Sequence, residues 1–336
     1  MVSMKDIAAK CGVSVATVSK ALNGHSDISD ETKKLIGDTA KAMGYFPNSS
    51  ARALKTKRTY NLGVLFVDQA QSGLTHDYFA HVLDSFKKYA ESSGYDITFI
   101  NAERQNNMSY LEHSRYRGVD GVVIACVDFD DQNVIDLINS DLPVVTIDHV
   151  FNNRTSVVSD NISGMRDLVN YVYEQGHRKI AYIYGDNTSV TQNRVASFCN
   201  TLKTLGIDLP DAYLQESSYR NPAKAGELTK KLMKMKNRPT CIIYPDDYSC
   251  IGGIAAIRDM GLSVPGDISV AGYDGLYVSQ ILNPKLTTVE QDTTEIGRIA
   301  AEELIKLIED PRTTLIDKFT VSGKVIAGGS VGGQAS

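Results

Sequence analysis

The sequence predicts two parts of different class: a small all-α head containing a helix-turn-helix, and a larger α/β domain of two lobes with parallel sheets. Three observations lead to this prediction. The first sixty residues contain short amphipathic helices with cap residues at their ends. From Asn61 onward, apolar residues form continuous runs of strand length. The same boundary separates a basic segment from an acidic one.

Cap residues define the first two helices of the head. Ser3 and Asp6 have the spacing of a capping box, and Gly12 is suited to end the helix that they begin. Ser14 can cap a second helix only two residues later, from Val15 to Leu22. Two short helices joined so closely cross at a steep angle, which is the arrangement of a helix-turn-helix.

The burial pattern of the head follows from these boundaries. In the second helix, Val18 and Leu22 are expected to face inward. Its exposed face is expected to carry Val15, Ala16 and Lys20. A third helix is predicted from about Asp30 to Met43, with Ser29 as its cap. Its buried stripe is expected to consist of Leu35, Ile36, Ala40 and Met43.

The charge of the head separates two interpretations, because the helical pattern also fits a three-helix bundle that binds nothing. Residues 1–60 contain ten Lys or Arg and five Asp or Glu, a net charge of +5. The other residues carry the remaining 25 of 35 basic and 35 of 40 acidic side chains, a net charge of −10. A basic head on an acidic body indicates a nucleic-acid partner for the head, since positive charge attracts phosphates.

A short helix is predicted between head and body. Asn48 can cap about two turns from Ser49 to Thr56. The apolar members of this segment are Ala51, Ala53 and Leu54. A helix this short is marginal in water and needs a surface to pack against. Small residues permit close approach to the floor of a DNA groove, and a leucine can wedge between base steps. The alternative is an ordinary interdomain linker.

The body alternates apolar strands with helices, which is typical of parallel sheets covered on both faces. Strands are expected at 62–67, 97–100, 121–125, 143–147, 179–184, 240–244 and 268–271. Helices are expected at about 78–93, at 134–138 and at 251–260. One further helix is expected to begin near residue 160, and another to end near residue 205. The segment from Asn61 to the end of the chain is longer than one α/β unit usually is, which favours two lobes. Ligands bind beyond the carboxyl ends of such strands, which here predicts a site in the cleft between the lobes.

Polar side chains near the ends of these strands form a candidate ligand site. They are Asp148, His149, Arg194, Tyr219, Asp246, Asp247 and Asp274. Carboxylates accept hydrogen bonds from hydroxyl groups, an arginine donates to them, and an aromatic ring packs on a sugar's C–H surface. The set therefore suits a neutral polyhydroxy ligand. Any one aspartate has an alternative role at a helix N-terminus, favoured by the helix dipole, and this stays open for Asp160 and Asp247.

A long, ordered motif runs through the head. It consists of Met-Lys-Asp-Ile-Ala at 4–8, Gly-Val-Ser-Val-Ala-Thr-Val-Ser-Lys-Ala-Leu-Asn-Gly at 12–24, Gly-Tyr-Phe-Pro-Asn at 44–48 and Ala-Arg-Ala-Leu at 51–54. This motif resembles the N-terminal signature and hinge of the lac repressor/galactose repressor (LacI/GalR) family. The resemblance continues to about residue 329. It implies a periplasmic-binding-protein-like fold for the two lobes and an effector-controlled regulator of transcription.

The resemblance implies DNA contacts from the second helix and the hinge. Val15 and Ala16 are expected to meet base edges in the major groove, while Thr17 and Ser19 hold phosphates. The DNA-binding set is Ser14, Val15, Ala16, Thr17, Ser19, Lys20, Asn23, Ala51 and Leu54, with Leu54 as the wedge. Lys20 stands where arginine is usual. Because lysine cannot form the bidentate fork on guanine, softer base discrimination is expected there.

The same resemblance supports a set of effector-binding residues. They are Tyr78, Asp148, His149, Arg194, Tyr219, Asp246, Asp274 and Gln291. Tyr78 lies in the usual first ligand loop, and Gln291 lies at a crossover between lobes. Asp246 departs from the family pattern, in which asparagine is common, so the ligand of no single member can be carried over.

The predicted domains follow from these segments. They are a head at 1–46, a hinge helix and linker at 47–60, a two-lobe effector-binding and dimerisation domain at 61–330, and a flexible tail at 331–336. The N-lobe is expected at about 61–159 and 292–322, and the C-lobe at about 160–291 and 323–330. The tail lacks leucine heptads, which favours a homodimer over a coiled-coil tetramer.

The predicted function is repression of genes for carbohydrate uptake or use. A homodimer would bind a pseudo-palindromic double-stranded operator and respond to a mono- or disaccharide, in the cytoplasm. The sequence does not encode whether the effector induces or co-represses.

Other classes find little support. No dinucleotide, phosphate-loop or nucleophile-elbow motif favours an enzyme. The five cysteines lack a Cys-x-x-Cys pair, so no metal or cofactor is predicted. No apolar run suggests a membrane span. The alternative is a solute-binding protein of the same two-lobe fold, for which a signal peptide is expected and none is found.

Overall fold

The structure is a computed structural model that describes residues 2–22, 24–45, 58–68, 73–101 and 108–333. It divides into two compact units, Met1–Thr59 and Tyr60–Ser336. The predicted hinge contacts of Ala51 and Leu54 lie outside the described residues, as does Asn23.

The head is a bundle of three short helices, as predicted. They are α1 (Met4–Cys11), α2 (Val15–Leu22) and α3 (Asp30–Ala42). The expected caps are present: Ser3 and Asp6 form a capping box, and Gly12 ends α1 with a φ of 67°. The Oγ of Ser14 accepts a hydrogen bond from the backbone N–H of Thr17 at 3.1 Å. These local bonds fix the start of α2 relative to the end of α1.

The core of the head contains one prediction that is wrong. Ile7, Val18 and Ile36 are fully buried at its centre, with Ala40 beside them. Leu35 was expected in this stripe, but 53% of its surface is exposed. Ile36 and Ala40 are four residues apart and share one helix face, whereas Leu35 is turned about 100° away from Ile36 toward solvent.

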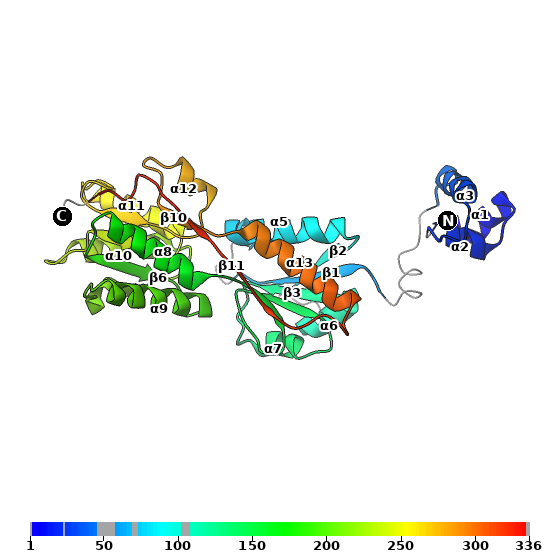
Figure 1. Cartoon of the computed structure of the whole chain (residues 1–336), viewed down its shortest axis with the longest axis horizontal. Coiled ribbons are helices and arrows are strands. Elements are labelled where there is room, and N and C mark those ends of the chain that lie inside the picture. The colour runs from blue at the N-terminus through cyan, green and yellow to red at the C-terminus, as the bar shows by residue number, and fades with distance from the viewer. Residues whose placement is uncertain (1, 23, 46–57, 69–72, 102–107, 334–336) are drawn as a thin grey trace. The chain divides into compact units, whose positions relative to one another are not determined.

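The N-lobe is built on a six-stranded parallel sheet with the order β11-β5-β4-β3-β1-β2 (Figure 1). Its strands are β1 (Asn61–Phe66), β2 (Asp96–Ile100), β3 (Gly121–Ala125), β4 (Val144–Ile147), β5 (Thr155–Ser159) and β11 (Lys318–Val321). Its helices are η1 (Gly73–Thr75), α5 (Asp77–Ser92), α6 (Tyr110–Arg117), α7 (Gln132–Ile138) and α13 (Thr293–Glu309).

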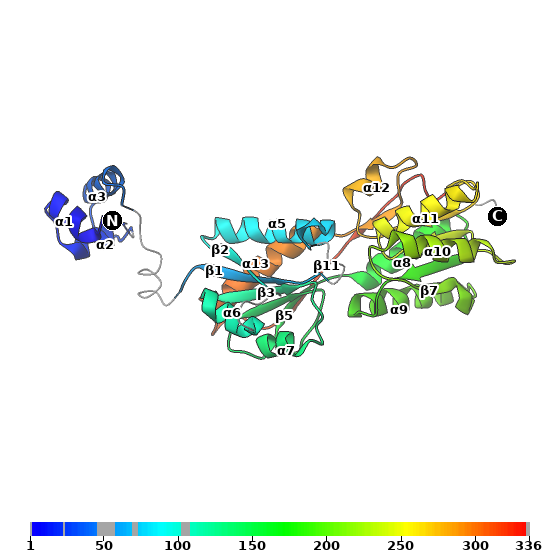
Figure 2. The same ribbon diagram turned by 180° about the vertical axis from the view of Figure 1, so that it is seen from behind.

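Helices cover both faces of this sheet, with α5 and α13 on one face and α6 and α7 on the other (Figures 1 and 2). Successive residues of β3 accordingly point to opposite faces: Val123 packs in the core under α5 and α13, and Val122 packs in the core under α6 and α7. The α13–α5 contact is close because position 297 is glycine: a Cβ there would lie 2.2 Å from the carbonyl oxygen of Val82. The N-lobe therefore has a backbone-to-backbone contact between its first and last helices.

The C-lobe repeats this plan with a four-stranded parallel sheet of order β7-β6-β8-β9. Its strands are β6 (Ile180–Tyr184), β7 (Leu214–Glu216), β8 (Cys241–Ile243) and β9 (Ser269–Ala271). Its helices are α8 (Asn161–Glu174), α9 (Ser189–Thr204), η3 (Asp211–Tyr213), α10 (Pro222–Met233), α11 (Asp247–Asp259) and α12 (Tyr277–Ile281). Helices α8 and α9 line one core, and α10 and α11 line the other.

An antiparallel pair of strands near the lobe crossover was not predicted. It consists of β10 (Thr288–Glu290) and β12 (Lys324–Ile326). The chain passes between the sheets of the two lobes after β5, after β10 and after β11. At each crossing the chain leaves one of the two lobes for the other.

The predicted flexible tail begins too early. Val331 is buried, and the backbone N–H of Gly332 donates to the Oγ of Ser269 at 3.0 Å. The carbonyl oxygen of Gly332 lies 3.0 Å from Nε2 of the buried His177. Packed structure therefore extends at least two residues past the predicted boundary. Among the described residues, no helix has the length and apolar composition needed to cross a membrane.

Candidate functional site

The start of α2 presents the predicted contact residues of the head. Val15 is 41% exposed, and Ala16 and Lys20 are exposed as well. Thr17 and Ser19 are half-buried, and the Thr17 hydroxyl lies 2.9 Å from the Oγ of Ser14. The exposed face thus combines small side chains at the helix start with a lysine one turn later.

Lys20 has an acidic partner that the sequence reasoning did not consider. Its Nζ donates to Oδ2 of Asp27 at 2.5 Å, and both side chains are about half exposed. The hydrogen bond from Lys20 holds the pKa of the Asp27 carboxyl below its usual value. A phosphate or base that contacts Lys20 therefore competes with this carboxylate.

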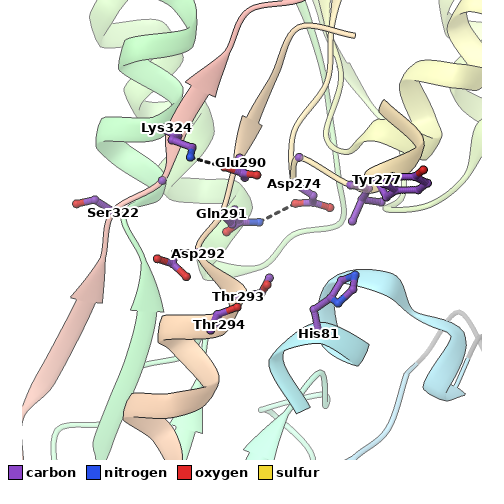
Figure 3. A pocket seen from close by; sticks show the side chains of 13 residues that line it. His81, Asp274, Tyr277, Glu290, Gln291, Asp292, Thr293, Thr294, Ser322 and Lys324 are labelled. Carbon is purple, nitrogen blue, oxygen red and sulfur yellow. Dashed lines mark hydrogen bonds and ion pairs between the residues drawn. The ribbon is translucent and has the colours of Figure 1, made fainter. Parts of the chain in front are cut away.

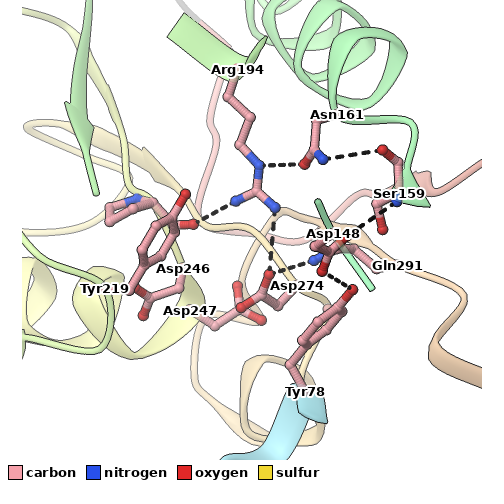
Figure 4. Close-up of polar contacts among 12 residues, drawn as sticks. Tyr78, Asp148, Ser159, Asn161, Arg194, Tyr219, Asp246, Asp247, Asp274 and Gln291 are labelled. Carbon is pink, nitrogen blue, oxygen red and sulfur yellow. Dashed lines mark hydrogen bonds and ion pairs between the residues drawn. The ribbon is translucent and has the colours of Figure 1, made fainter. Parts of the chain in front are cut away.

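In the larger unit, the polar cluster between the lobes is organised around Arg194 of α9, which is buried (Figure 4). Its Nε donates to Oδ1 of Asn161 at 2.7 Å, and its Nη1 donates to the carbonyl oxygen of Pro245 at 3.0 Å. Its guanidinium carbon lies 3.6 Å from the ring centroid of Tyr273. Three elements of the C-lobe thus fix one guanidinium at the end of the sheet.

Asp274 lies beside this guanidinium, with its Oδ1 4.0 Å from Nη2 of Arg194. Nε2 of Gln291, from the lobe crossover, donates to the same oxygen at 2.7 Å. Burial raises the pKa of Asp274 to about 7, although Arg194 opposes the shift. The carboxyl group therefore titrates near neutral pH.

Two of the predicted aspartates adopt a left-handed backbone, Asp148 with a φ of 60° and Asp274 with a φ of 99°. Non-glycine residues adopt such conformations at a cost, and they cluster at functional sites where surrounding structure holds them. Asp148 is held by hydrogen bonds to both oxygens, from Tyr78 Oη at 2.9 Å and from the backbone N–H of Ser159 at 3.3 Å. The structure thus brings Tyr78 and Asp148 together from the N-lobe.

Tyr219 supplies the aromatic plane of the cluster. Its hydroxyl lies 2.8 Å from Oγ1 of Thr191, and its backbone N–H donates to Asp186. The ring lies so close to Gly185 that a Cβ there would come within 2.5 Å of it. Glycine at position 185 is therefore required for the observed position of the ring.

The remaining aspartates have structural roles. Asp246 caps α11: it accepts hydrogen bonds from the N–H and Oγ of Ser249, both at 2.8 Å, and from the N–H of Arg220. Asp247 accepts from Thr288 and Leu276, and its burial raises its pKa well above the usual value. Asp160 also has the alternative role considered in the sequence analysis, a position at a helix N-terminus. It caps α8 by accepting a hydrogen bond from the N–H of Ser163.

His149 lies in a different environment from that expected. Its ring stacks on Phe129 with centroids 4.2 Å apart, and it also contacts Phe151. Among the described residues, its ring contacts Phe129 and Phe151 rather than the polar cluster, and its carbonyl oxygen accepts from Oγ1 of Thr146. Burial lowers its pKa, so the ring favours the neutral form.

A cavity of about 480 Å³ lies at the lobe crossover (Figure 3). Asp274 and Gln291 line it, together with His81 of α5, Tyr277 of α12 and the start of α13. The other predicted effector residues do not line it. We assign the candidate site to the Arg194 cluster rather than to this cavity, because the cluster carries the buried polar groups and strained aspartates, and Asp274 and Gln291 are common to both.

Three hydrogen bonds between described residues join the two lobes across the cleft, and no pattern in the sequence indicated them. Tyr248 donates its hydroxyl hydrogen to Asp77. Nη2 of Arg220 donates to the carbonyl oxygen of Thr75 at 3.4 Å, and Ser189 donates to the carbonyl oxygen of Asp148 at 3.2 Å. Tyr248, Arg220, Thr75, Ser189 and Asn161 are members of the cluster that the sequence analysis missed. Within the described chain, no cluster of side chains has the composition of a metal site.

Comparisons with known proteins agree with this architecture. Residues 3–48 match the model of the bacterial regulatory proteins of the lacI family, and residues 169–331 match a periplasmic binding protein-like domain. The chain is 30% identical to the HTH-type transcriptional repressor PurR of Mannheimia succiniciproducens, covering 92% of each protein. It is 31% identical to the ribose operon repressor of Haemophilus influenzae, covering 93% of each.

The chain belongs to the LacI family of transcriptional regulators. Among solved structures, the lac repressor dimer bound to operator and the anti-inducer ONPF has the same fold, with a TM-score of 0.83 at 24% identity over 98% of this chain and 99% of that one. This LacI-family protein is accordingly a DNA-binding regulator with a helix-turn-helix head, and its relatives are repressors rather than enzymes.

The Lys20–Asp27 pair generates a prediction about DNA binding. Asp27→Asn removes the competing carboxylate, so we expect tighter binding to non-operator duplex. The plot of log affinity against log salt concentration should steepen by about 0.9, the equivalent of one phosphate contact. Fluorescence anisotropy over a salt series measures this slope. Asp30→Asn is the matched control, because it removes the same charge next to Lys33 of α3 instead. Equal slopes for both variants would show a general charge effect.

The raised pKa of Asp274 generates a prediction about stability and pH. The folded protein holds a proton on Asp274 up to about pH 7, whereas the unfolded chain releases it near 3.8, so stability falls as the pH rises between these values. The Asp274→Asn variant has no carboxyl group at this position, so its stability lacks this dependence on pH. We expect the melting temperature of the variant, relative to the parent, to be higher at pH 8 than at pH 5.

The control for this experiment is Asp267→Asn. Hydrogen bonds from Ser263 hold the pKa of Asp267 below its usual value, so this group is ionised throughout that range. Its variant should differ from the parent by the same amount at both pH values. A pH-independent difference for Asp274→Asn as well would contradict the assigned titration.

Proposed function

We propose that this LacI-family regulator represses genes for carbohydrate uptake or use in the cytoplasm. It binds a pseudo-palindromic operator as a homodimer and responds to a mono- or disaccharide held between its lobes. The observation that carries the effector assignment is the cluster of Arg194, Asp274, Asp148 and Tyr219. One donor, two acceptors with strained backbones and an aromatic plane are the groups that a polyhydroxy ring needs.

The names of two similar proteins support a sugar as the class of effector. One relative is the ribose operon repressor, and one solved structure of the same fold is the regulator CelR in complex with cellobiose, with a TM-score of 0.71 at 22% identity. At position 246 this chain has aspartate where asparagine is common in the family. This difference argues against assigning ribose or cellobiose to this chain as its effector. Since Asp246 caps α11 and binds the Arg220 N–H, its acceptor positions are largely occupied.

In the proposed DNA complex, α2 lies in the major groove. Val15 and Ala16 contact base edges, and Thr17 and Ser19 contact phosphates, with Ser14, Lys20 and Asn23 at the margins of the contact. Ala51 and Leu54 enter the minor groove from the hinge, where Leu54 opens a base step. Exposure of Val15 and Ala16 in the structure supports the first part of this proposal.

Effector and operator are coupled in this proposal through the angle between the lobes. Closing the cleft on a ligand changes this angle, and the hinge segments of a dimer respond. Each ligand then alters the affinity of the other by the same factor. The direction of coupling, induction or co-repression, is left to experiment.

The family resemblance implies a dimer contact along N-lobe helices such as the one from Tyr78 to Ser93, and we propose that α12 contributes to the contact as well. The exposed side of α5 carries the ion pairs Lys87–Glu91 and Lys88–Asp84. On α12, by contrast, Tyr277 is 77% and Ile281 is 62% exposed. Beside them lies an apolar groove lined by Ile251, Ile254, Ala255, Leu282 and Pro284. Exposed apolar surface of this kind marks protein–protein contacts, and the second copy is the occupant that the homodimer supplies.

The function is tested with the promoter region of the gene itself in a gel shift, with and without candidate sugars. We expect a sequence-selective band that a sugar weakens or strengthens. Arg194→Lys should retain the band but lose effector affinity by about 10- to 100-fold, because a charged hydrogen bond to the ligand contributes about 1.5–3 kcal/mol. Arg178→Lys is the control, since that guanidinium lies over Tyr173. Absence of a selective band would end the proposal.

The dimer contact is tested by sedimentation velocity at several protein concentrations. Ile281→Asp places a charge on the proposed contact and should shift the parent dimer toward monomer. Ile162→Asp is the matched control, since Ile162 is 54% exposed at the start of α8, away from α12. A parent that is monomeric when bound to operator, or a stable tetramer, would contradict the homodimer. Equal dissociation of both variants would contradict the α12 contact.

A further inference from the structure

Arg220 and His76 come from opposite lobes and are neighbours at the cleft, and each has one buried nitrogen atom without a hydrogen-bond partner. Nη1 of Arg220 and Nδ1 of His76 are both buried without a hydrogen-bond partner among the described residues. Nη2 of Arg220 contacts the carbonyl oxygen of Thr75, the residue before His76. Burying polar groups without partners is unfavourable. Their juxtaposition therefore indicates an acceptor that comes from outside the chain.

The guanidinium of Arg220 is held in place by neutral groups. Besides the Thr75 contact, it lies over the ring of Tyr248, 4.9 Å from the centroid. Its backbone has a φ of 52°, and its N–H donates to Asp246 at 2.8 Å. This strained conformation, like those of Asp148 and Asp274, is typical of a position fixed for function. Arg220 thus brings a second positive charge to the cleft, for which the sequence predicted only Arg194.

Two of the three acidic groups near Arg220 accept hydrogen bonds from other donors, and the third, Asp68, acts on the same groups as Arg220 does. Asp77 accepts the hydroxyl hydrogen of Tyr248. Asp246 accepts from Ser249 and from the N–H of Arg220 itself. Asp68 is the remaining carboxylate, and its charge acts on His76 and Cys126.

His76 complements Arg220 as a neutral donor. Burial, together with the positive charge of Arg220, lowers the pKa of His76 to about 4. At neutral pH the ring therefore carries one N–H and no charge, and it donates from Nδ1 in the appropriate tautomer. A guanidinium with an adjacent imidazole N–H offers two donors from two lobes to a single acceptor group.

The rest of the cleft is less negative than its four aspartates suggest. Burial raises the pKa values of Asp148 and Asp247, and it raises that of Asp274 to about 7. These shifts move the carboxyl groups toward their neutral forms. With Arg194 and Arg220 as its two positive charges, the formal excess of acids in the cleft does not exclude an anionic ligand.

We propose that Arg220 and His76 hold an anionic oxygen group, a carboxylate or a phosphate, on the polyhydroxy effector. The inference rests on the proposed function, because it places this group on the same ligand that Arg194 and Asp274 bind. Arginine suits the role since its planar fork matches the oxygens of carboxylate and phosphate. Because the donors come from both lobes, the anionic group also links the lobes.

The test uses calorimetry on the full chain with matched probes. Glucose, glucuronate and glucose 6-phosphate form one series, and galactose, galacturonate and galactose 6-phosphate form the other. We expect one acidic form to bind the parent at least about 10-fold more tightly than its neutral counterpart. Arg220→Ala should reduce the affinity for that acidic form by about 10- to 100-fold while changing that of the neutral form less than about threefold. Preference for the uronate or for the phosphate identifies the source of the charge.

Two further variants separate local recognition from general electrostatics. Lys224→Ala removes an exposed positive charge from α10 four residues away and should leave the acidic preference intact. Arg220→Lys keeps the charge without the fork and should retain part of it. If the neutral forms bind the parent as tightly as the acidic ones, or if Arg220→Ala weakens both equally, the inference is overturned while the proposed function stands. If none of the six probes binds, the inference is overturned, whereas the sugar effector is decided separately by the gel shift with candidate sugars.

Discussion

The cleft depends on one buried positive charge. A guanidinium withdrawn from water requires acceptors, and Arg194 finds them on segments that are distant in sequence: Asn161 at the start of α8, the carbonyl of Pro245 after β8, and Asp274 after β9. Pro245 and Asp274 follow strands of the C-lobe, whereas Asn161 follows β5, where the chain enters the C-lobe from the N-lobe. The parallel sheet brings the strand ends to one edge, and Arg194 then sets the positions of the side chains there.

The lobes are joined by apolar packing, by hydrogen bonds and by the chain crossings, and Leu276, Tyr248 and Val278 of the C-lobe pack against the N-lobe core. Polar bonds from Tyr248, Arg220 and Ser189 cross the cleft on one side. At the other side the chain crosses three times between the sheets, next to the β10–β12 pair. Within the N-lobe, Gly297 brings α13 against the backbone of α5. A change in lobe angle can therefore move α5 and α13 together, so that a ligand contact at the cleft is transmitted to the opposite end of the lobe.

Local signals in the sequence predicted the head and most of the strands. The caps at Ser3, Ser14 and Ser29 are formed within four residues, so their residue types determine them directly. The burial of Leu35 was wrong because neighbouring apolar residues can belong to different helix faces. Elements whose partners are distant, such as β5, α10, α13 and the β10–β12 pair, carried weaker signals. The same applies to the tail, which packs through contacts of Gly332 with Ser269 and His177.

The site was predictable where strand ends position it and unpredictable where the two lobes meet. Arg194, Asp274, Tyr78 and Asp148 lie in the polar cluster that was expected. His149 follows the same strand as Asp148, but its ring stacks on Phe129, a contact that spacing along the chain does not reveal. Arg220 was missed because its partner, Thr75, is 145 residues away. Such contacts follow from lobe closure rather than from any local pattern.

The pairing of Lys20 with Asp27 has a consequence for how quickly the protein locates its target. A genome offers a vast excess of non-target sequence, and each additional phosphate contact lengthens the time that a regulator remains there. The Asp27 carboxylate pairs with Lys20 when no phosphate does, and this competition shortens the residence time of the protein on non-target DNA. In the proposed DNA complex, the other contacts of α2 would hold it in the groove at the correct sequence while Lys20 exchanges Asp27 for a phosphate. Asp27 thus favours rapid search over tight general adhesion, through a single exposed ion pair.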